Sequence, residues 1–290
     1  MYAGSIPTLA SIFPLLFYIP PRGGMAYLNA MFAVRCLSII LSAILLSGCG
    51  GGGGSSDEDT DPFVGTRLAP QNIASTQTGW TYPVYVYLPD GYATSNLDYP
   101  VIYELDAEPH FDESADILDA NAREVILVSI GNTGTERRKI DFTMPGARQY
   151  YDFLTLELIP FIDAQYRTDP ANRTLAGHSL SGYFVALAML FKTPGARNFL
   201  SFLSSDGTFW YQAELTIELE QQLADMTNEL PVNLILSAAT EGNVYSVSGF
   251  YYLLLDRNYA DFFLAYLPYD TSHLAVHALS FQAGIDLLFP

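Results

Sequence analysis

The stretch Arg173-Thr174-Leu175-Ala176-Gly177-His178-Ser179-Leu180-Ser181-Gly182 decides the fold of this chain. Its apolar run from Thr174 to Ala176 suits a short buried strand. The turn from Gly177 to Gly182 is rich in small residues, and the run after it is rich in Ala, Leu and Met, which are good helix formers. The stretch therefore predicts a strand, a sharp turn with Ser179 at its tip, and a buried helix.

A serine in such a turn has a chemical use. The turn projects the hydroxyl of Ser179 to where a base can reach it, and the helix N-terminus behind it offers N–H groups to an oxyanion. The match to Gly-x-Ser-x-Gly is imperfect, because Ser181 stands where the last Gly is expected and Gly182 follows. Taken alone, the stretch also fits a strand–turn–helix connection with incidental serines.

Composition limits the function classes. The 290 residues allow one large or two small domains, and half of them are hydrophobic, so a sizeable core is available. The formal net charge is −18, which argues against nucleic acid as a partner, since phosphate neutralisation needs a basic surface.

The N-terminal region predicts export. We interpret residues 1–48 as a signal peptide with a mis-assigned N-terminal extension. Its apolar run ends in Leu46-Ser47-Gly48-Cys49, which resembles a bacterial lipobox, where the signal is cleaved before a cysteine that becomes lipid-modified. We expect a lipid anchor on Cys49, and with it a place in the bacterial cell envelope, at the outer membrane or facing the periplasm. A plain secretory signal or an anchoring helix is the alternative.

Residues 49–65 form a Gly/Ser-rich and then acidic stretch that predicts a flexible tether, and residues 66–290 are the expected catalytic domain. No cysteine follows Cys49, so the domain contains neither an internal disulfide nor thiol chemistry. Within the domain, strand and helix patterns alternate, which implies a mostly parallel sheet covered on both faces. We predict strands at 81–88, 99–105, 125–130, 199–204, 232–237 and 262–267, and helices at 113–123, 149–166, 213–226, 249–256 and 276–288.

The search for a base is short, because the chain has four histidines. In a serine hydrolase of this topology the base follows the last strand, which favours His273 over His277. His178 adjoins the serine and should point away from its hydroxyl, and His110 comes early in the chain. His273 and His277 lack the glutamate that a zinc protease needs between them, so we predict neither a metal nor a cofactor.

The orienting acid is expected after the strand before the last. Glu241 ends that strand and is our choice, with Asp256 and Asp270 as alternatives. The backbone N–H groups of Leu180 and of Ala107, in the loop after strand 99–105, are the expected oxyanion donors. The choice of Ala107 rests on topology.

Several further segments look familiar, in order and with sensible spacing. The chain resembles the esterase family of α/β-hydrolases that includes ferric-enterobactin esterases, S-formylglutathione hydrolases, feruloyl esterases and mycolyltransferases. The likeness runs over about residues 80 to 289, and Ser181 and Ala107 depart from it where the family has Gly. Its segments are Val84–Tyr92, Tyr99–Asp106 ("YPVLYLLDG" in the family), Arg138–Thr143 ("R-x-x-D-[YF]-T"), Glu157–Ile162, Tyr166–Thr168, Ser204–Trp210 ("SPSLWW") and His273–Ile285 ("H-x-x-V…G-L").

This resemblance implies an α/β-hydrolase fold and a serine hydrolase that cleaves small-molecule carboxylic esters without a cofactor. It carries the nucleophile to Ser179, the base to His273 and the acid to Glu241. We also expect substrate contacts near the reacting serine. The candidates are Asp106, His178, Phe209 and Trp210, of which the two aromatic residues could bind an apolar or aromatic acyl group or belong to the core.

Two other functions remain open at this stage. One is an acyltransferase of the same fold that excludes water and uses an alcohol acceptor. The other is a non-catalytic surface-binding lipoprotein on a hydrolase scaffold, because a fold does not guarantee a function.

Overall fold

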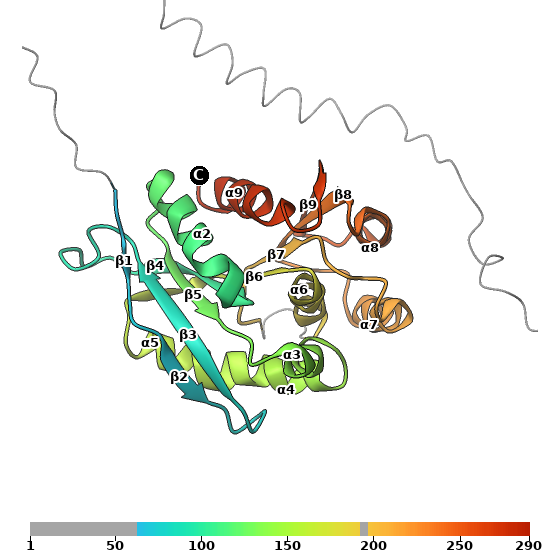
Figure 1. Cartoon of the computed structure of the whole chain (residues 1–290). Helices are drawn as coiled ribbons and strands as arrows, with labels where there is room; N and C mark the ends of the chain where they lie inside the picture. Colours follow the sequence, from blue (N-terminus) through green and yellow to red (C-terminus); the bar gives the residue numbers. More distant parts are fainter. Residues whose placement is uncertain (1–62, 192–196) are drawn as a thin grey trace, which may run out of the picture. The chain divides into compact units, whose positions relative to one another are not determined.

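A computed structural model describes residues 63–191 and 197–290 (Figure 1). These residues belong to one unit that spans Asp61–Pro290. The predicted signal peptide, Cys49 and most of the predicted tether lie outside the described residues.

One mixed sheet forms the centre of this unit. The strands hydrogen-bond in the order β1-β3-β5-β4-β6-β7-β8-β9, and β2 pairs with β3 beside that path. The pairs that involve β3 are antiparallel, and all pairs from β5 to β9 are parallel. The strands are β1 (Thr66–Arg67), β2 (Gln71–Ala74), β3 (Thr81–Leu88), β4 (Tyr99–Leu105), β5 (Ile126–Ile130), β6 (Thr168–His178), β7 (Ser201–Ser205), β8 (Asn233–Glu241) and β9 (Phe263–Ser272).

Helices cover both faces of the sheet, as Figure 1 shows. On one face, α2 and α9 pack Phe111, Leu118 and Phe281 against the strands. On the other face, α6 lies in the middle of a larger cluster, and every residue of this helix is buried. The helices are α2 (Ala107–Ala120), α3 (Thr135–Phe142), α4 (Gly146–Asp152), the π-helical segment η2 (Phe153–Leu158), α5 (Ile159–Asp163), α6 (Leu180–Leu190), α7 (Ala213–Met226), α8 (Val244–Arg257) and α9 (Val276–Leu288).

The predicted architecture, a mostly parallel sheet with helices on both faces, is confirmed. β3, β4, α7 and α9 have the bounds that their residue patterns predicted. Three predicted helices differ, and α3 was not predicted. The predicted helix 149–166 is a continuous helical run from Gly146 to Asp163 that contains the π segment, α8 begins at Val244 rather than at Gly249, and α2 begins at Ala107 rather than at Glu113. The earlier start of α2 matters, because it places the start of a helix at the predicted oxyanion loop.

The parallel strands β4, β6, β7 and β9 all end at the same edge of the sheet. Asp106, Ser179, Asp206 and His273 each follow the last residue of one of these strands. The carboxyl edge of a parallel sheet is where α/β proteins build their ligand sites, because the loops there converge. The fold therefore brings together four polar residues that are far apart in the chain.

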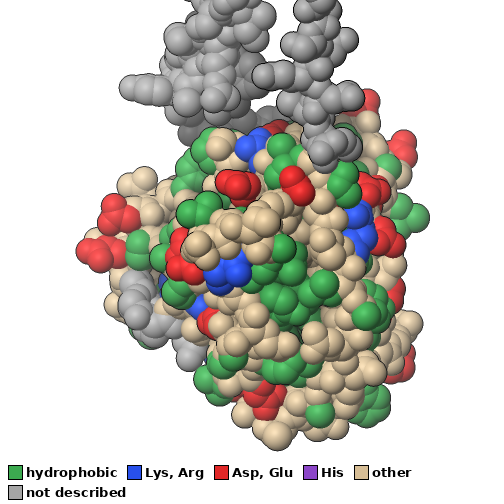
Figure 2. All heavy atoms as spheres, turned by 90° about the vertical axis from the view of Figure 1, so that its left-hand side faces the viewer, with side chains coloured by type: hydrophobic (Ala, Val, Ile, Leu, Met, Phe, Trp, Pro, Cys, Tyr) green, Lys and Arg blue, Asp and Glu red, His purple; other side chains and the backbone are tan. Residues whose placement is uncertain are grey.

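Charge is dispersed on the face that lies toward β1–β3. Figure 2 shows acidic side chains scattered there among hydrophobic and neutral ones, with the basic side chains interspersed rather than gathered into one patch. Among the described helices, none has both the length and the apolar character needed to cross a membrane.

Candidate active site

Ser179 occupies a strained turn between β6 and α6. Its backbone φ of 63° and ψ of −119° place a non-glycine residue in a region that L-residues rarely adopt. The turn is held at both ends, because the Ser179 N–H donates to the Ser205 carbonyl (2.9 Å) and the Ser179 carbonyl accepts from Tyr183 N–H (3.0 Å). The predicted strand, sharp turn and helix are thus present, with Ser179 at the tip.

His273 reaches the hydroxyl of this serine from the end of β9. Its Nε2 lies 2.9 Å from Ser179 Oγ, and its Nδ1 lies 2.5 Å from Asp206 Oδ2. A carboxylate accepts, so the ring proton sits on Nδ1 and Nε2 is free to accept from the hydroxyl. The sequence prediction that His273 is the histidine brought to Ser179 agrees with this geometry, whereas His277 lies in α9.

Asp206 holds the position that we assigned to Glu241. Its side chain is fully buried, and Oδ1 accepts the backbone N–H groups of Ala239 (3.0 Å) and Asn243 (3.0 Å). Three N–H donors, counting His273 Nδ1, satisfy a charge that would otherwise be costly to bury. Gly242 lets the chain pass close to the carboxylate, since a Cβ there would lie 2.2 Å from Asp206 Oδ2.

The prediction for Glu241 is therefore wrong. β8 continues through Glu241, which pairs with Ser272 of β9 at an exposed tip of the ladder instead of turning toward His273. The alternative Asp270, in β9, accepts a hydrogen bond from Thr240 (3.0 Å) at the same exposed end of β8. Asp256, the other alternative, is exposed in α8. Asp206 follows β7, one strand earlier than expected.

The sequence carried a weak signal for Asp206, namely Asp-Gly directly after a buried strand. The expectation of an acid after the strand before the last pointed to Glu241 instead. Its left-handed backbone, with φ of 44°, is the conformation that Asp tolerates better than most residues. A search for acids after every strand of the predicted sheet, rather than after one, would have included it.

Ser181, the departure from the Gly-x-Ser-x-Gly pattern, has a structural use. Its hydroxyl donates to Asp106 Oδ2 (2.8 Å) and accepts the backbone N–H of His178 (3.0 Å). The close packing that the last glycine of the pattern usually provides is found at Gly182, where a Cβ would lie 2.8 Å from the Ser205 carbonyl oxygen. The elbow is therefore preserved, with a hydrogen bond to the loop after β4.

Asp106 supports this loop and is not available for substrate. It is buried, and Arg138 from α3 binds both of its carboxylate oxygens at 2.7–2.9 Å. The bidentate pair balances the charge of Asp106 beside the turn. The expectation that Asp106 contacts substrate is thus wrong. Its left-handed backbone, with φ of 64°, leads directly into Ala107, the first residue of α2.

Ala107 and Leu180 begin α2 and α6. The first N–H groups of a helix have no partner within that helix and carry the positive end of its dipole. Both predicted donors therefore stand at helix N-termini, and their role as oxyanion donors stays a prediction. Ala107 is almost fully buried and packs in the cluster with Ile102 and Phe111.

His178 is buried next to Ser179 in the chain and hydrogen-bonds the backbone of His273. Its Nε2 donates to the backbone carbonyl of His273 (2.7 Å). Burial, aided by the neighbouring His273, lowers the pKa of His178 from 6.5 to about 3, so the ring stays neutral. The expected substrate contact of His178 stays a prediction, and against it stand the burial of the side chain and the engagement of its Nε2 with the His273 carbonyl.

Phe209 and Trp210, the two aromatic residues expected to contact substrate, differ in their exposure. Phe209 is buried and stacks on Phe250 at 4.6 Å, so its predicted substrate contact is replaced by a place in the core. Trp210 is 61% exposed, and its indole N–H donates to Asn243 Oδ1 (2.8 Å). Asn243 also donates to Asp206, so Trp210 is anchored at the acid end of the site.

Comparisons with known proteins identify the family of the chain. A family model described as "Putative esterase" matches residues 75–249. Ferri-bacillibactin esterase BesA of Bacillus subtilis is 26% identical over 199 residues, which cover 57% of this chain and 68% of that protein. An esterase of Mycobacterium tuberculosis is 29% identical over 184 residues, which cover 60% of this chain but only 38% of the relative.

Solved structures give the same result. An IroE-like serine hydrolase from Shewanella oneidensis superposes with a TM-score of 0.68 and 25% identity, covering 76% of this chain and 79% of that one. The chain belongs to the esterase family that the model describes, and its fold is that of the α/β serine hydrolases.

Proposed function

We propose that this protein cleaves carboxylic esters through an acyl-enzyme on Ser179. The observation that carries the proposal is the unbroken chain of hydrogen bonds from Ser179 Oγ through His273 to the buried carboxylate of Asp206. A nucleophile, a base and an orienting acid in this order form the arrangement that acyl transfer to serine requires.

The distances suggest the course of the reaction. Ser179 Oγ attacks the ester carbonyl carbon and passes its proton to His273 Nε2 over 2.9 Å. Asp206 keeps the other ring proton on Nδ1 and stabilises the imidazolium that forms. His273 then gives its proton to the departing alcohol as the carbon–oxygen bond breaks. Water, deprotonated by His273, attacks the acyl-enzyme and releases the acid and Ser179.

The oxyanion of each tetrahedral intermediate needs N–H donors. We assign this role to the backbone of Leu180 and Ala107, the first residues of α6 and α2. The contact from Ser181 to Asp106 links the turn that carries one donor to the residue that precedes the other. We therefore infer that Ser181 and Arg138 hold the two donors in register.

His178 serves as a positioning residue in this scheme. It is neutral, and its hydrogen bond to the His273 carbonyl ties the loop after β9 to the end of β6. The backbone of His273 is thus held by His178, and its ring is held by Asp206. Together these two contacts limit the rotation of the His273 ring away from Ser179.

Exposed apolar side chains occur next to residues of the site, either in the chain or through a hydrogen bond. They form what we call the apolar rim, consisting of Trp210 (61% exposed), Tyr245 (89%) and Leu274 (81%). Trp210 and Tyr245 flank Asn243, and Leu274 follows His273 directly in the chain. Exposed aromatic groups of this kind bind flat apolar ligands. We propose a small-molecule ester with an aromatic acyl group as the substrate.

The relative from Bacillus makes ferri-bacillibactin the first natural ester to test. Ester cleavage by the purified chain is followed by mass spectrometry, with and without an added alcohol acceptor. Release of the free acid in both cases supports a hydrolase, and transfer to the acceptor would instead indicate an acyltransferase. Ester cleavage that persists unchanged in Ser179→Ala would refute the assignment of the nucleophile.

We propose further that the protein is a lipoprotein of the bacterial cell envelope, anchored through Cys49. The support is the sequence Leu46-Ser47-Gly48-Cys49 at the end of an apolar run. Radiolabelled palmitate incorporated by the wild type and lost in Cys49→Ser is the expected result. Intact-mass measurement of an unmodified cysteine in the exported protein would contradict it.

A further inference from the structure

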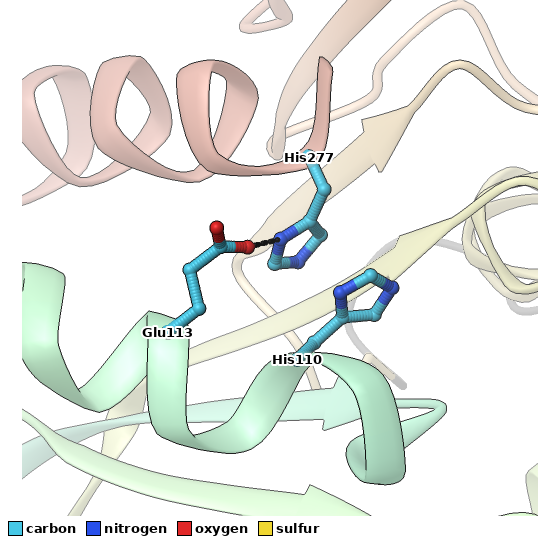
Figure 3. Close-up of side chains that lie close together, drawn as sticks. All are labelled: His110, Glu113 and His277. Atoms are coloured by element: carbon cyan, nitrogen blue, oxygen red, sulfur yellow. Dashed lines mark hydrogen bonds and ion pairs between the residues drawn. The ribbon is translucent and has the colours of Figure 1, made fainter. Parts of the chain in front are cut away.

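A second cluster of titratable side chains lies between α2 and α9. His110 and Glu113, three residues apart on α2, share one face of that helix, and His277 comes from the first turn of α9. One ligand atom from each residue lies within 4.8 Å of the others. Figure 3 shows the carboxylate of Glu113 against the ring of His277, with His110 beside them. The mechanism above uses none of these three side chains.

His277 is oriented by a buried carboxylate on its other side. Its Nε2 lies 3.2 Å from Glu104 Oε1, while its Nδ1 lies 3.0 Å from Glu113 Oε2. Glu104 is fixed in turn by the hydroxyls of Ser114 (2.6 Å) and Ser129 (2.8 Å). Histidine ligands of metal ions characteristically hold a carboxylate with the nitrogen that does not bind the metal, which fixes the ring and its tautomer.

The charges of the cluster are unbalanced. Among the described residues, the ion pairs of Glu104 and of Glu113 are formed with His277 alone, so one imidazolium faces two carboxylates. Glu104 is 1% exposed, where an uncompensated negative charge is costly. A divalent cation that replaces the Nδ1 proton of His277 would bring the sum of these charges to zero.

Binding requires one rearrangement that the exposure of the side chains permits. The rings of His110 and His277 are stacked at 3.6 Å with 16° between their planes. A metal bonds in the plane of each imidazole, so the ring of His110 has to tilt out of this stack. His110 is partly exposed and Glu113 is half exposed, which leaves both free to close on the fixed, buried His277.

We propose that His110, Glu113 and His277 bind one divalent transition-metal ion, with Zn²⁺ as the best match. Two imidazoles and a carboxylate are ligands that Zn²⁺ accepts at about 2.0–2.2 Å, and water completes a tetrahedron. The proton on His277 Nδ1 is released as the metal–nitrogen bond forms, and Nε2–H stays on Glu104. The ion joins α2, which begins at Ala107, to α9, which begins three residues after His273, so it braces the two loops of the active site.

The test is direct binding of Zn²⁺ to the full chain, purified without a histidine tag. Isothermal titration calorimetry is expected to show one ion per chain with a Kd of about 10 μM or tighter, and a rise in melting temperature by mass action. His110→Ala and Glu113→Gln are expected to weaken binding by about tenfold or more. Both positions are at least partly exposed, so these variants should fold.

Asp112→Asn is the matched control. It removes a carboxylate from the same helix, next to Glu113, but its side chain faces Arg67 and solvent. Binding in this variant should equal that of the wild type. Absence of binding to the wild type at millimolar Zn²⁺, or equal binding to the wild type, His110→Ala and Glu113→Gln, would overturn the proposal. Neither readout depends on ester cleavage.

Discussion

Asp206 accepts a hydrogen bond from His273 Nδ1 at 2.5 Å, although the two residues are 67 positions apart in the chain. The contact forms because β7 and β9 end at the same edge of the sheet, with β8 between them. Two backbone N–H groups, one from Ala239 in β8 and one from Asn243 in the loop after it, also donate to the carboxylate. Asp206 is thus fully buried, and its carboxylate is held against the His273 ring by bonds on both oxygens.

Replacing Asp206 should impair catalysis far more than replacing Glu241. Asp206→Asn keeps the shape but favours the wrong tautomer of His273, so we expect kcat to fall by roughly 10³ to 10⁴-fold. Glu241→Gln, at an exposed strand tip, should change kcat less than twofold. Steady-state hydrolysis of p-nitrophenyl butyrate measures both. Equal losses in the two variants would restore Glu241 as the orienting acid.

Removing the hydroxyl of Ser181 should destabilise the fold. Ser181→Ala leaves the buried His178 N–H without its partner, at a cost of about 1–3 kcal/mol, while Asp106 Oδ2 keeps its bonds to Arg138. Ser248→Ala, which removes an exposed hydroxyl on α8, should change the free energy of unfolding by less than about 0.5 kcal/mol. Urea unfolding compares them. A Ser181→Ala variant as stable as Ser248→Ala would show that the contact contributes nothing.

His178 should make the fold acid-sensitive. Its pKa of about 3 in the folded chain lies below the ordinary value of 6.5, so between these values the unfolded chain takes up a proton that the folded chain does not. Its stabilising contribution is present above pH 6.5 and is lost as the pH falls toward 3. The rings of His110, His273 and His277 face it from neighbouring elements and share its surroundings.

The comparison uses His178→Gln, which keeps an amide donor but cannot titrate. Between pH 6.5 and 4.5 the free energy of unfolding of the wild type should fall more steeply than that of the variant, by up to about 1.4 kcal/mol per pH unit. Urea unfolding in the presence of a chelator excludes metal effects. If the free energy of unfolding fell equally steeply with pH in the wild type and in His178→Gln, His178 would have to be protonated in the folded chain as well.

Trp210 should influence the choice of acyl group. Trp210→Ala removes the anchored, exposed indole, so KM should rise about 5- to 50-fold for an aromatic acyl ester such as p-nitrophenyl benzoate and stay near wild type for the acetate. The other tryptophan of the chain provides the control. Trp80 lies exposed beside Arg137, and Trp80→Ala should alter neither KM. A uniform effect on both esters would argue against an aromatic acyl pocket.

Local patterns predicted most of the fold. The alternation in 81–88 and the apolar run in 99–105 specify their strands, because side-chain burial repeats with the period of the sheet. The start of α2 was missed, because its first turn contains Pro109 and His110 rather than helix-forming apolar residues. Proline is tolerated in the first turn of a helix, where its missing N–H costs nothing.

Site residues of a rare type could be predicted from the sequence, whereas those of a common type could be predicted only in part. Four histidines and one elbow left few options for Ser179 and His273, whereas the chain has 31 acidic residues. Which of them meets His273 depends on the lengths of β7 and β8 and on the loop over Asp206, and these follow from tertiary packing. The role of Ser181 was equally hidden, since its partner Asp106 lies 75 positions away.

Labelling with a fluorophosphonate probe tests the central claim most directly. The probe reacts with a serine only when its base and oxyanion donors are assembled, and it needs no knowledge of the substrate. We expect the purified wild-type chain to be labelled at Ser179, and labelling to disappear in Ser179→Ala and in His273→Ala. A folded wild-type chain that remains unlabelled, or that is labelled equally in Ser179→Ala, would contradict an active site built on Ser179, His273 and Asp206.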